Sequence, residues 1–247
     1  MDKMIYVSMA GASEFMNLQT VVAHNLANVT TTGFRADLLR YESVPVAGDV
    51  YPSRVYAVAG DTGVNLSPGP LRTTGRDLDI AVDGDGYIAV EALDGGEAYT
   101  RAGNLQINQV GQLLTGAGEP VLGNGGPIAV PPFEKIDIAA DGTISIRPVG
   151  QDATALVVVD RIRLVRPDPA LLVKNEQGLL VRRDGEVSVP DASVRVASGV
   201  LEGSNVNAVE AMVTMLDLSR QFELQVKMME TADRNEQAAA ELLRLGG

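Results

Sequence analysis

Cysteine is absent from this chain of 247 residues, and histidine occurs once. Without cysteine the chain can form neither a disulfide nor a thiolate metal site. A single histidine also excludes most zinc sites and the Cys/His hydrolases. Tryptophan is absent as well and aromatic residues make up 4%, whereas hydrophobic residues make up 45%. We therefore expect a sizeable core that is built from aliphatic side chains.

Basic residues are fewer than acidic ones, 20 against 32, which gives a formal net charge of −12. This charge disfavours nucleic acid and anionic lipid as partners, because both are bound by basic surfaces. No stretch reaches the roughly 20 apolar residues that span a membrane, so we expect no membrane insertion. Residues 1–6 lack the basic start and the apolar run of a secretory signal. If the protein leaves the cytoplasm, we expect a route without a cleaved signal peptide.

Proline is missing from both ends of the chain. All twelve prolines fall between Pro45 and Pro190, and residues 208–245 also contain no glycine. Proline inside a helix costs about 3 kcal/mol and glycine about 1 kcal/mol. Both ends can therefore form uninterrupted helices, whereas the middle, which is punctuated by glycine and proline, cannot. Two terminal helices on either side of a β-rich middle region indicate a protein that assembles with other subunits rather than one with a catalytic pocket.

The first helix is predicted over residues 3–29. Apolar residues recur there at the spacing of one helix face, and they include Ile5, Met9, Ala12, Met16 and Leu26. The β-branched residues 30–32 and Gly33 indicate its end.

The second helix is predicted over about 36 residues after Asn207, which with Glu210 forms a capping-box pattern. Such a helix is about 54 Å long. Its apolar stripe consists of Met212, Met215, Leu216, Phe222, Val226 and Met229. A helix of that length needs a partner, so we expect the first helix to pair with it in a coiled-coil-like manner. Apolar surface would remain for neighbouring copies.

The middle of the chain is expected to be rich in short strands. Turn dipeptides separate the apolar runs, and the strand candidates are residues 78–82, 87–90, 136–138, 144–146, 156–159, 162–165, 179–181 and 194–196. The sequence therefore predicts an α+β fold, in which a β-rich domain of antiparallel strands is inserted between the terminal helices. The expected domains are a discontinuous helical domain (1–36 and 204–247), an extended arm with short strands (37–78) and a β-rich domain (79–203).

Three local patterns are compatible with a metal-binding or phosphate-binding site, and an ordinary structural role is favoured for each. His24 has no second histidine or thiol to share a metal with. Asp79, Asp83 and Asp85 offer oxygen ligands for calcium, but their spacing is not that of an EF-hand, so solvated strand and turn residues are preferred. Residues 123–126 are rich in glycine but precede Pro127 instead of a helix, so a phosphate loop is not expected.

No catalytic, cofactor-binding or metal-binding residue is therefore predicted, and no cofactor. A glycoside hydrolase stays open in principle, since any two of the 32 acidic residues can meet in the fold. An enzyme or a ligand-binding module formed by the β-rich domain is thus the remote alternative to a structural protein.

Four segments together resemble the axial proteins of the bacterial flagellum, which build its rod and hook. They are residues 25–35 (NLANVTTTGFR), residues 78–87 (LDIAVDGDGY), residues 99–104 (YTRAGN) with their continuation through 111–115 (GQLLT) and 120–123 (PVLG), and residues 199–207 (GVLEGSNVN). They span most of the chain in the family's order. Residues 1–12 resemble the proximal rod branch, and the distal rod branch is the alternative.

The resemblance implies a structural subunit of the basal-body rod, which crosses the periplasm and transmits torque to the hook. Its partners would be neighbouring copies, other rod proteins and the flagellar type III export apparatus. The terminal helices would line the tube and the β-rich middle would face outward. The residues expected at the assembly interface are Ile5, Met9, Met16, Asn25, Leu26, Asn28, Met212, Leu216, Phe222, Val226 and Met229.

Overall fold

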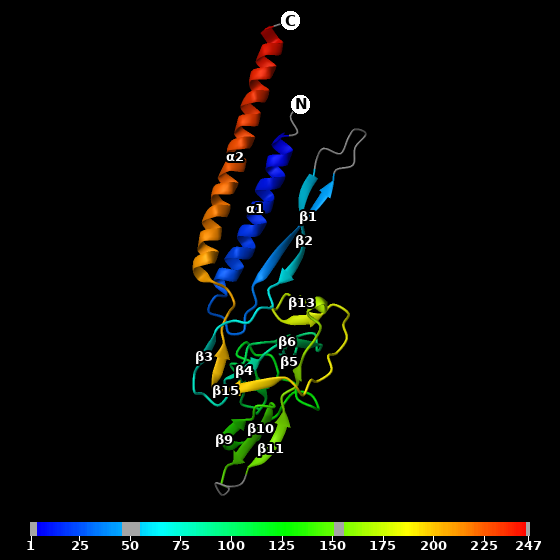
Figure 1. Ribbon diagram of the computed structural model, residues 1–247, viewed down its shortest axis with the longest axis vertical. Coiled ribbons are helices and arrows are strands. Elements are labelled where there is room, and N and C mark those ends of the chain that lie inside the picture. Colours follow the sequence, from blue (N-terminus) through cyan, green and yellow to red (C-terminus); the bar gives the residue numbers. More distant parts are fainter. Residues whose placement is uncertain (1–3, 46–54, 151–155, 246–247) are drawn as a thin grey trace. The chain divides into compact units, whose positions relative to one another are not determined.

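The computed structural model describes residues 4–45, 55–150 and 156–245. It contains two long helices, α1 (Met4–Ala27) and α2 (Ala208–Leu245), and the sequence between them forms short antiparallel strands (Figure 1). The predicted α+β class is confirmed. The chain divides into two units. Unit 1 comprises Met1–Ala27, Asp37–Gly63 and Asn207–Gly247, and unit 2 comprises Asn28–Ala36 and Val64–Val206.

In unit 1, α1 and α2 lie side by side and run in opposite directions (Figure 1). Small residues line the contact, which lets the helices approach closely. A Cβ atom added at Gly11 would lie 3.3 Å from the side chain of Gln225. The residues buried along the pair are Ser8, Ala12, Leu218 and Ala232. None of the described helices is long and apolar enough to cross a membrane.

The start of α2 follows the predicted capping pattern. Oδ1 of Asn207 accepts hydrogen bonds from the backbone N–H groups of Val209 at 3.1 Å and Glu210 at 3.4 Å. These bonds satisfy two of the N–H groups that a helix leaves without an internal partner.

The end of α1 lies two residues before the predicted one, and Gly33 does not cap the helix as expected. The chain turns after Ala27, and Asn25 binds the backbone of the next strand. Nδ2 of Asn25 donates to the carbonyl of Asp37 at 2.9 Å, and the N–H of Asp37 donates to Oδ1 of Asn25 at 2.8 Å. The helix therefore stops where its side chains begin to bind β1 (Asp37–Pro45).

The region predicted as an arm, residues 37–78, contains β1, β2 (Val55–Val64) and β3 (Leu71–Thr73), and residues 46–54 within it lie outside the described residues. β1 pairs with β2 in a two-stranded sheet. The structure thus groups Asp37–Gly63 with the helices. The predicted domain boundaries stay a prediction.

The remaining strands lie in unit 2. Five of them form a sheet of order β12-β5-β6-β14-β13. A three-stranded sheet has the order β11-β10-β9, and the pairs β15-β4, β16-β3 and β7-β8 complete the unit. The bounds are β4 (Ile80–Asp83), β5 (Tyr87–Glu91), β6 (Glu97–Thr100), β7 (Gln106–Ile107), β8 (Leu113–Leu114), β9 (Phe133–Ile138), β10 (Thr143–Pro148), β11 (Val157–Arg161), β12 (Leu164–Val165), β13 (Leu172–Lys174), β14 (Leu180–Arg182), β15 (Arg195–Ser198) and β16 (Val200–Glu202), with a short 3₁₀ helix (Pro169–Leu171) before β13.

The core of unit 2 is aliphatic, as the composition predicts. Its fully buried members include Ile80, Ile88, Leu105, Leu113 and Ile144. Each predicted strand segment overlaps a strand of the structure, but β3, β6, β7, β8, β13 and β16 were not predicted. These strands are two to four residues long, which is too short to show a period-2 pattern.

The strand predicted at residues 78–82 is not divided into one buried and one exposed face. Ile80, Ala81 and Val82 are all buried. Asp79 is buried as well, so the expectation of a solvated strand residue fails there. β15 pairs with β4, and Oδ1 of Asp79 accepts from Nη1 of Arg76 at 3.4 Å. A buried carboxylate needs such a partner because desolvation penalises its charge.

One pH-dependent effect arises at the turn between β9 and β10. Hydrogen bonds from the backbone and the hydroxyl of Thr143 lower the pKa of Asp141. A depressed pKa means that the carboxylate contributes stability above its unfolded-state pKa, and that this contribution is lost as the pH falls through the folded-state pKa. We expect Thr143→Val to raise the pKa of Asp141 partway to its ordinary value, because the backbone bond stays. An NMR titration of the carboxyl carbon measures this shift, and Asp191, whose pKa is lowered mainly by Ser193, is the internal control.

Candidate functional site

The strongest concentration of buried charge in unit 2 surrounds Glu202, which is 1% exposed. Nη2 of Arg35 donates to Oε1 of Glu202 at 2.6 Å. Nη1 of Arg101 donates to Oε2 at 3.0 Å. Both arginines are buried as well. One carboxylate thus binds two guanidinium groups from parts of the chain that are far apart in sequence.

Backbone groups complete the coordination of Glu202. The N–H of Gly69 donates to Oε1 of Glu202 at 2.8 Å, and the N–H of Gly33 donates to its carbonyl at 2.8 Å. β16, which ends at Glu202, pairs with β3, so the glutamate is held by its strand as well as by its side chain. Gly33 has a φ of 69°, a conformation that glycine adopts readily and other residues do not.

Arg101 is oriented from the side of the β-rich core. Its Nη1 and Nη2 donate to the carbonyls of Val82 at 3.2 Å and Gly84 at 2.5 Å. Its guanidinium carbon lies 5.0 Å from the centre of the Tyr87 ring, a cation–π contact. Burial raises the pKa of Tyr87, and the charges of Arg101 and Arg35 oppose that rise. Tyr87 therefore acts here as a neutral aromatic support.

Asn205 binds the segment that follows Arg35. Its Oδ1 accepts from the N–H of Ala36 at 2.8 Å, and its Nδ2 donates to the carbonyls of Asn65 at 2.8 Å and Ser67 at 3.0 Å. The amide of Asn205 thereby connects its own segment to the segments at residue 36 and at residues 65–67, which do not pair with one another in a sheet. Because Asn205 lies two residues before the cap of α2, these bonds fix the segment that leads into that helix.

Lys174 adds a third cation to the same neighbourhood. Its Nζ donates to the carbonyl of Arg35 at 2.9 Å and lies 4.0 Å from the centre of the Phe34 ring. The segment after Gly33 is therefore held from both sides, by Glu202 and by Lys174. We call the side chains of Arg35, Arg101 and Glu202 the buried triad.

The buried triad carries one surplus positive charge, since two guanidinium groups face one carboxylate. Nε and Nη1 of Arg35 and Nε of Arg101 are buried and have no hydrogen-bond partner among the described residues. Such donors cost free energy, typically about 1–3 kcal/mol each. The arrangement holds chain segments in place and offers no nucleophile or general base.

The sequence motifs include all three residues of the buried triad, but they do not show that these residues contact one another. Arg35, Arg101 and Glu202 belong to three of the four family-like segments, but none was named as a site residue. The sequence signal for these three residues is that each is the one charged residue of its motif. The ion pairs join residues 167 and 101 positions apart, so only the fold brings them together.

The residues predicted for the assembly interface lie on α1 and α2, except Asn28, which follows α1. More than half exposed are Met9, Met16, Met212 and Leu216. Partly buried are Ile5, Leu26, Phe222, Val226 and Met229. Asn25 binds Asp37, and Asn28 lies in unit 2, where its Oδ1 accepts from the hydroxyl of Thr31 at 3.1 Å. Their role in assembly stays a prediction.

The residues that suggested chemistry have structural partners. Nδ1 of His24 lies 2.8 Å from Oδ2 of Asp37, so the histidine helps Asn25 to hold β1. Asp83 and Asp85 are exposed, and Oδ2 of Asp85 accepts from Arg166 at 3.1 Å. Residues 123–126 form a turn closed by the N–H of Gly123 and the carbonyl of Gly126 at 2.8 Å. Within the described part of the chain, no group of three or more acidic or histidine side chains is placed to hold a metal.

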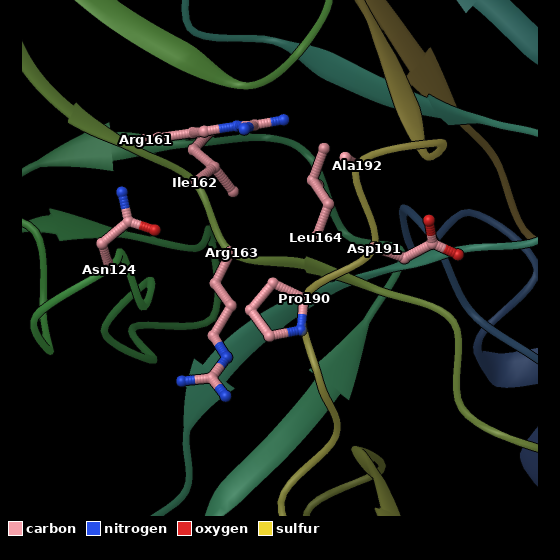
Figure 2. Close-up of a pocket in the computed structure, with 8 residues that line it drawn as sticks. All are labelled: Asn124, Arg161, Ile162, Arg163, Leu164, Pro190, Asp191 and Ala192. Atoms are coloured by element: carbon pink, nitrogen blue, oxygen red, sulfur yellow. The ribbon is translucent and has the colours of Figure 1, made fainter.

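An open pocket of about 240 Å³ lies in unit 2 between the loop at Asn124, the segment around β12 and residues 190–192 (Figure 2). Its two arginines point away from one another in Figure 2. Arg161 donates to the carbonyl of Asp141 at 2.8 Å, and Arg163 donates to the carbonyl of Ser188 at 3.0 Å. Both guanidinium groups are therefore already engaged in holding the fold.

Two family models match the chain. Residues 81–146 match the flagellar hook protein FlgE/F/G D1 domain, and residues 197–242 match the C-terminal region of the flagellar basal body rod FlgEFG proteins. Flagellar basal-body rod proteins FlgF of Salmonella typhimurium and Escherichia coli are each 43% identical over 99% of this chain and 100% of their own length. The flagellar basal-body rod protein FlgG of Bacillus subtilis is 30% identical over 99% of this chain and 100% of its own.

The likeness thus covers both units and is greater to the FlgF proteins than to this FlgG protein. It includes the segments that supply Arg101 and Glu202 to the buried triad, since these residues lie inside the two matched regions. The chain belongs to the flagellar FlgE/F/G rod and hook family and, within it, to the FlgF rod proteins.

Proposed function

We propose that the chain is a structural subunit of the flagellar basal-body rod, where it packs into the drive shaft that transmits torque to the hook. The observation that carries this proposal is full-length likeness, at 43% identity, to proteins named as FlgF rod proteins. Those relatives are named as rod proteins of the flagellar basal body, which favours packing over catalysis as the function. The distal, FlgG-like position is the less supported alternative.

The helices of unit 1 are the proposed assembly surface. Large apolar side chains are exposed on both helices, and they are Tyr6, Val7, Met9 and Met16 on α1 and Val209, Met212, Val213, Leu216, Leu224 and Met228 on α2. Burying such side chains contributes about 25 cal/mol per Å² of apolar area. Neighbouring copies that cover them would therefore gain stability on assembly, and the helices would pair in a coiled-coil-like manner.

The proposed domain roles follow the same logic. Residues 1–36 and 204–247 would form the inner, helical part of the rod, residues 37–78 the arm, and residues 79–203 the inserted β-rich outer domain. The proposed partners are neighbouring copies and other rod proteins. Delivery would use the flagellar type III export apparatus without a cleaved signal peptide, to a rod that crosses the periplasm.

Electron microscopy of basal bodies isolated from a strain that lacks this gene tests the proposal. We expect rods that stop short, without a hook and without export of later axial subunits. Arrest early in the rod supports the proximal position, and arrest after the proximal part supports the distal one. Complete basal bodies with normal hooks would contradict a rod function and would direct attention to ligand binding by unit 2.

A further inference from the structure

Three segments of unit 2 that lie near elements of unit 1 in the sequence are held mainly by polar contacts around Glu202. They comprise residues 33–36, 65–73 and 199–205, which we call the latch. Its backbone bonds include Gly33 N–H to Glu202 O at 2.8 Å and Gly203 N–H to Pro70 O at 2.9 Å. The side chain of Asn205 binds both Ala36 and Asn65. These hydrogen bonds connect the three segments of the latch to one another.

Little apolar burial supports the latch. All three residues of β3 are exposed, and β3 pairs only with β16 among the described strands. Leu201 is buried and Leu66 is partly buried against the core. By contrast, Ile144 and Ile146 of β10 are completely buried. Regions with few buried apolar contacts open at lower free energy than the core of the same protein.

The buried triad makes the closed latch depend on one residue. Glu202 is the one carboxylate in hydrogen-bond contact with Arg35 and Arg101, and three of the N–H groups of these arginines are buried without a partner in the described structure. Removing one partner of a buried ion pair leaves an uncompensated charge, which strongly destabilises the closed form. Removing Arg35 instead would leave a balanced pair, Arg101 with Glu202. The two changes should therefore have very different effects.

We propose that the latch is a conformational device that opens as one cooperative unit, controlled by Glu202, while the β-rich core of unit 2 stays folded. In the closed form residues 33–36 and 199–205 are bound to one another and to the rest of unit 2. In the open form Arg35 and Glu202 separate and reach water, and both segments are released together. Arg101 keeps its bonds to Val82 and Gly84 and remains with the core.

Native-state amide hydrogen exchange of the full chain, measured by NMR over a series of urea concentrations, tests the proposal. We expect the amides of Gly33, Gly69 and Gly203 to exchange with one shared opening rate and one shared dependence on urea. The amides of β10 should exchange at least tenfold more slowly. Unrelated opening rates for the three glycines, or rates equal to those of β10, would overturn the proposal.

Two variants separate control by Glu202 from a general loss of stability. Glu202→Gln should speed exchange of the three glycine amides 100-fold or more. The β10 amides lose the same stabilisation when the whole unit unfolds, so they should exchange faster as well but stay at least tenfold slower than the glycine amides. Arg35→Met should change the glycine amides less than tenfold. Glu186→Gln, at a carboxylate that is 76% exposed beside Arg182, should leave all of them within threefold. Loss of the tenfold gap between the latch and β10 in Glu202→Gln, or equal effects of Glu202→Gln and Arg35→Met, would contradict the proposal.

Discussion

Replacing Gly33 with alanine is expected to lower the free energy of unfolding of unit 2 by about 3 kcal/mol or more. Gly33 has a φ of 69°, which costs an L-residue roughly 1–2 kcal/mol. In addition, the new Cβ atom would lie 2.3 Å from the backbone nitrogen of Ala102 and 2.3 Å from the carbonyl carbon of Arg101. Backbone atoms cannot rotate away as a side chain does. The segment that carries Arg35 would therefore be pushed away from Glu202.

Gly75→Ala is the matched control, because Gly75 has nearly the same φ, 71°, and no atom within 4 Å of the added Cβ. Its loss should be about 1 kcal/mol, since only the backbone conformation is penalised. Chemical denaturation, followed by the fluorescence of the tyrosines, compares the two variants. If both variants lost the same stability, the close approach of Gly33 to residues 101 and 102 would not be what the fold requires there.

Gly33 also shows where sequence reasoning succeeds and where it stops. A glycine after β-branched residues correctly indicates a position with positive φ. The sequence assigned that position to the end of α1, whereas α1 ends at Ala27 and Gly33 donates to the carbonyl of Glu202. The local rule identifies the backbone conformation. It cannot identify a partner that is 169 positions further along the chain.

The helices were predictable because their signals are local. The absence of proline and glycine and the cap at Asn207 indicate α2 without any knowledge of the fold, and the structure confirms its start. β3 and β16 carry no such signal, because each has three residues and they are paired across the chain. The buried triad depends on that pairing. Recognising it from sequence would require knowing which one of the 32 acidic residues and which two of the 20 basic residues are desolvated together.

Leu216→Asp is expected to abolish swimming and to stop rod assembly, while the isolated chain stays folded. Leu216 is 62% exposed on α2, so the substitution should change the stability of the chain by less than about 1 kcal/mol. If neighbouring copies cover Leu216, each contact would bury an unpaired carboxylate, which costs several kcal/mol. In a rod of many copies that cost recurs at every subunit. Motility assays and electron microscopy of basal bodies from the complemented deletion strain measure the effect.

Leu93→Asp provides the matched control, since it makes the same chemical change at a leucine of unit 2 that is 88% exposed. Leu93 lies outside the proposed helical assembly surface, so this strain should swim normally. Circular dichroism of the purified Leu216→Asp protein should retain the signal of the strands. Normal rods from Leu216→Asp would remove Leu216 from the assembly interface, and loss of rods from both variants would mean that unit 2 also packs against neighbours. Both leucines are more than half exposed in the isolated chain, so neither substitution removes core packing, and a large difference in rod assembly would point to contacts between subunits.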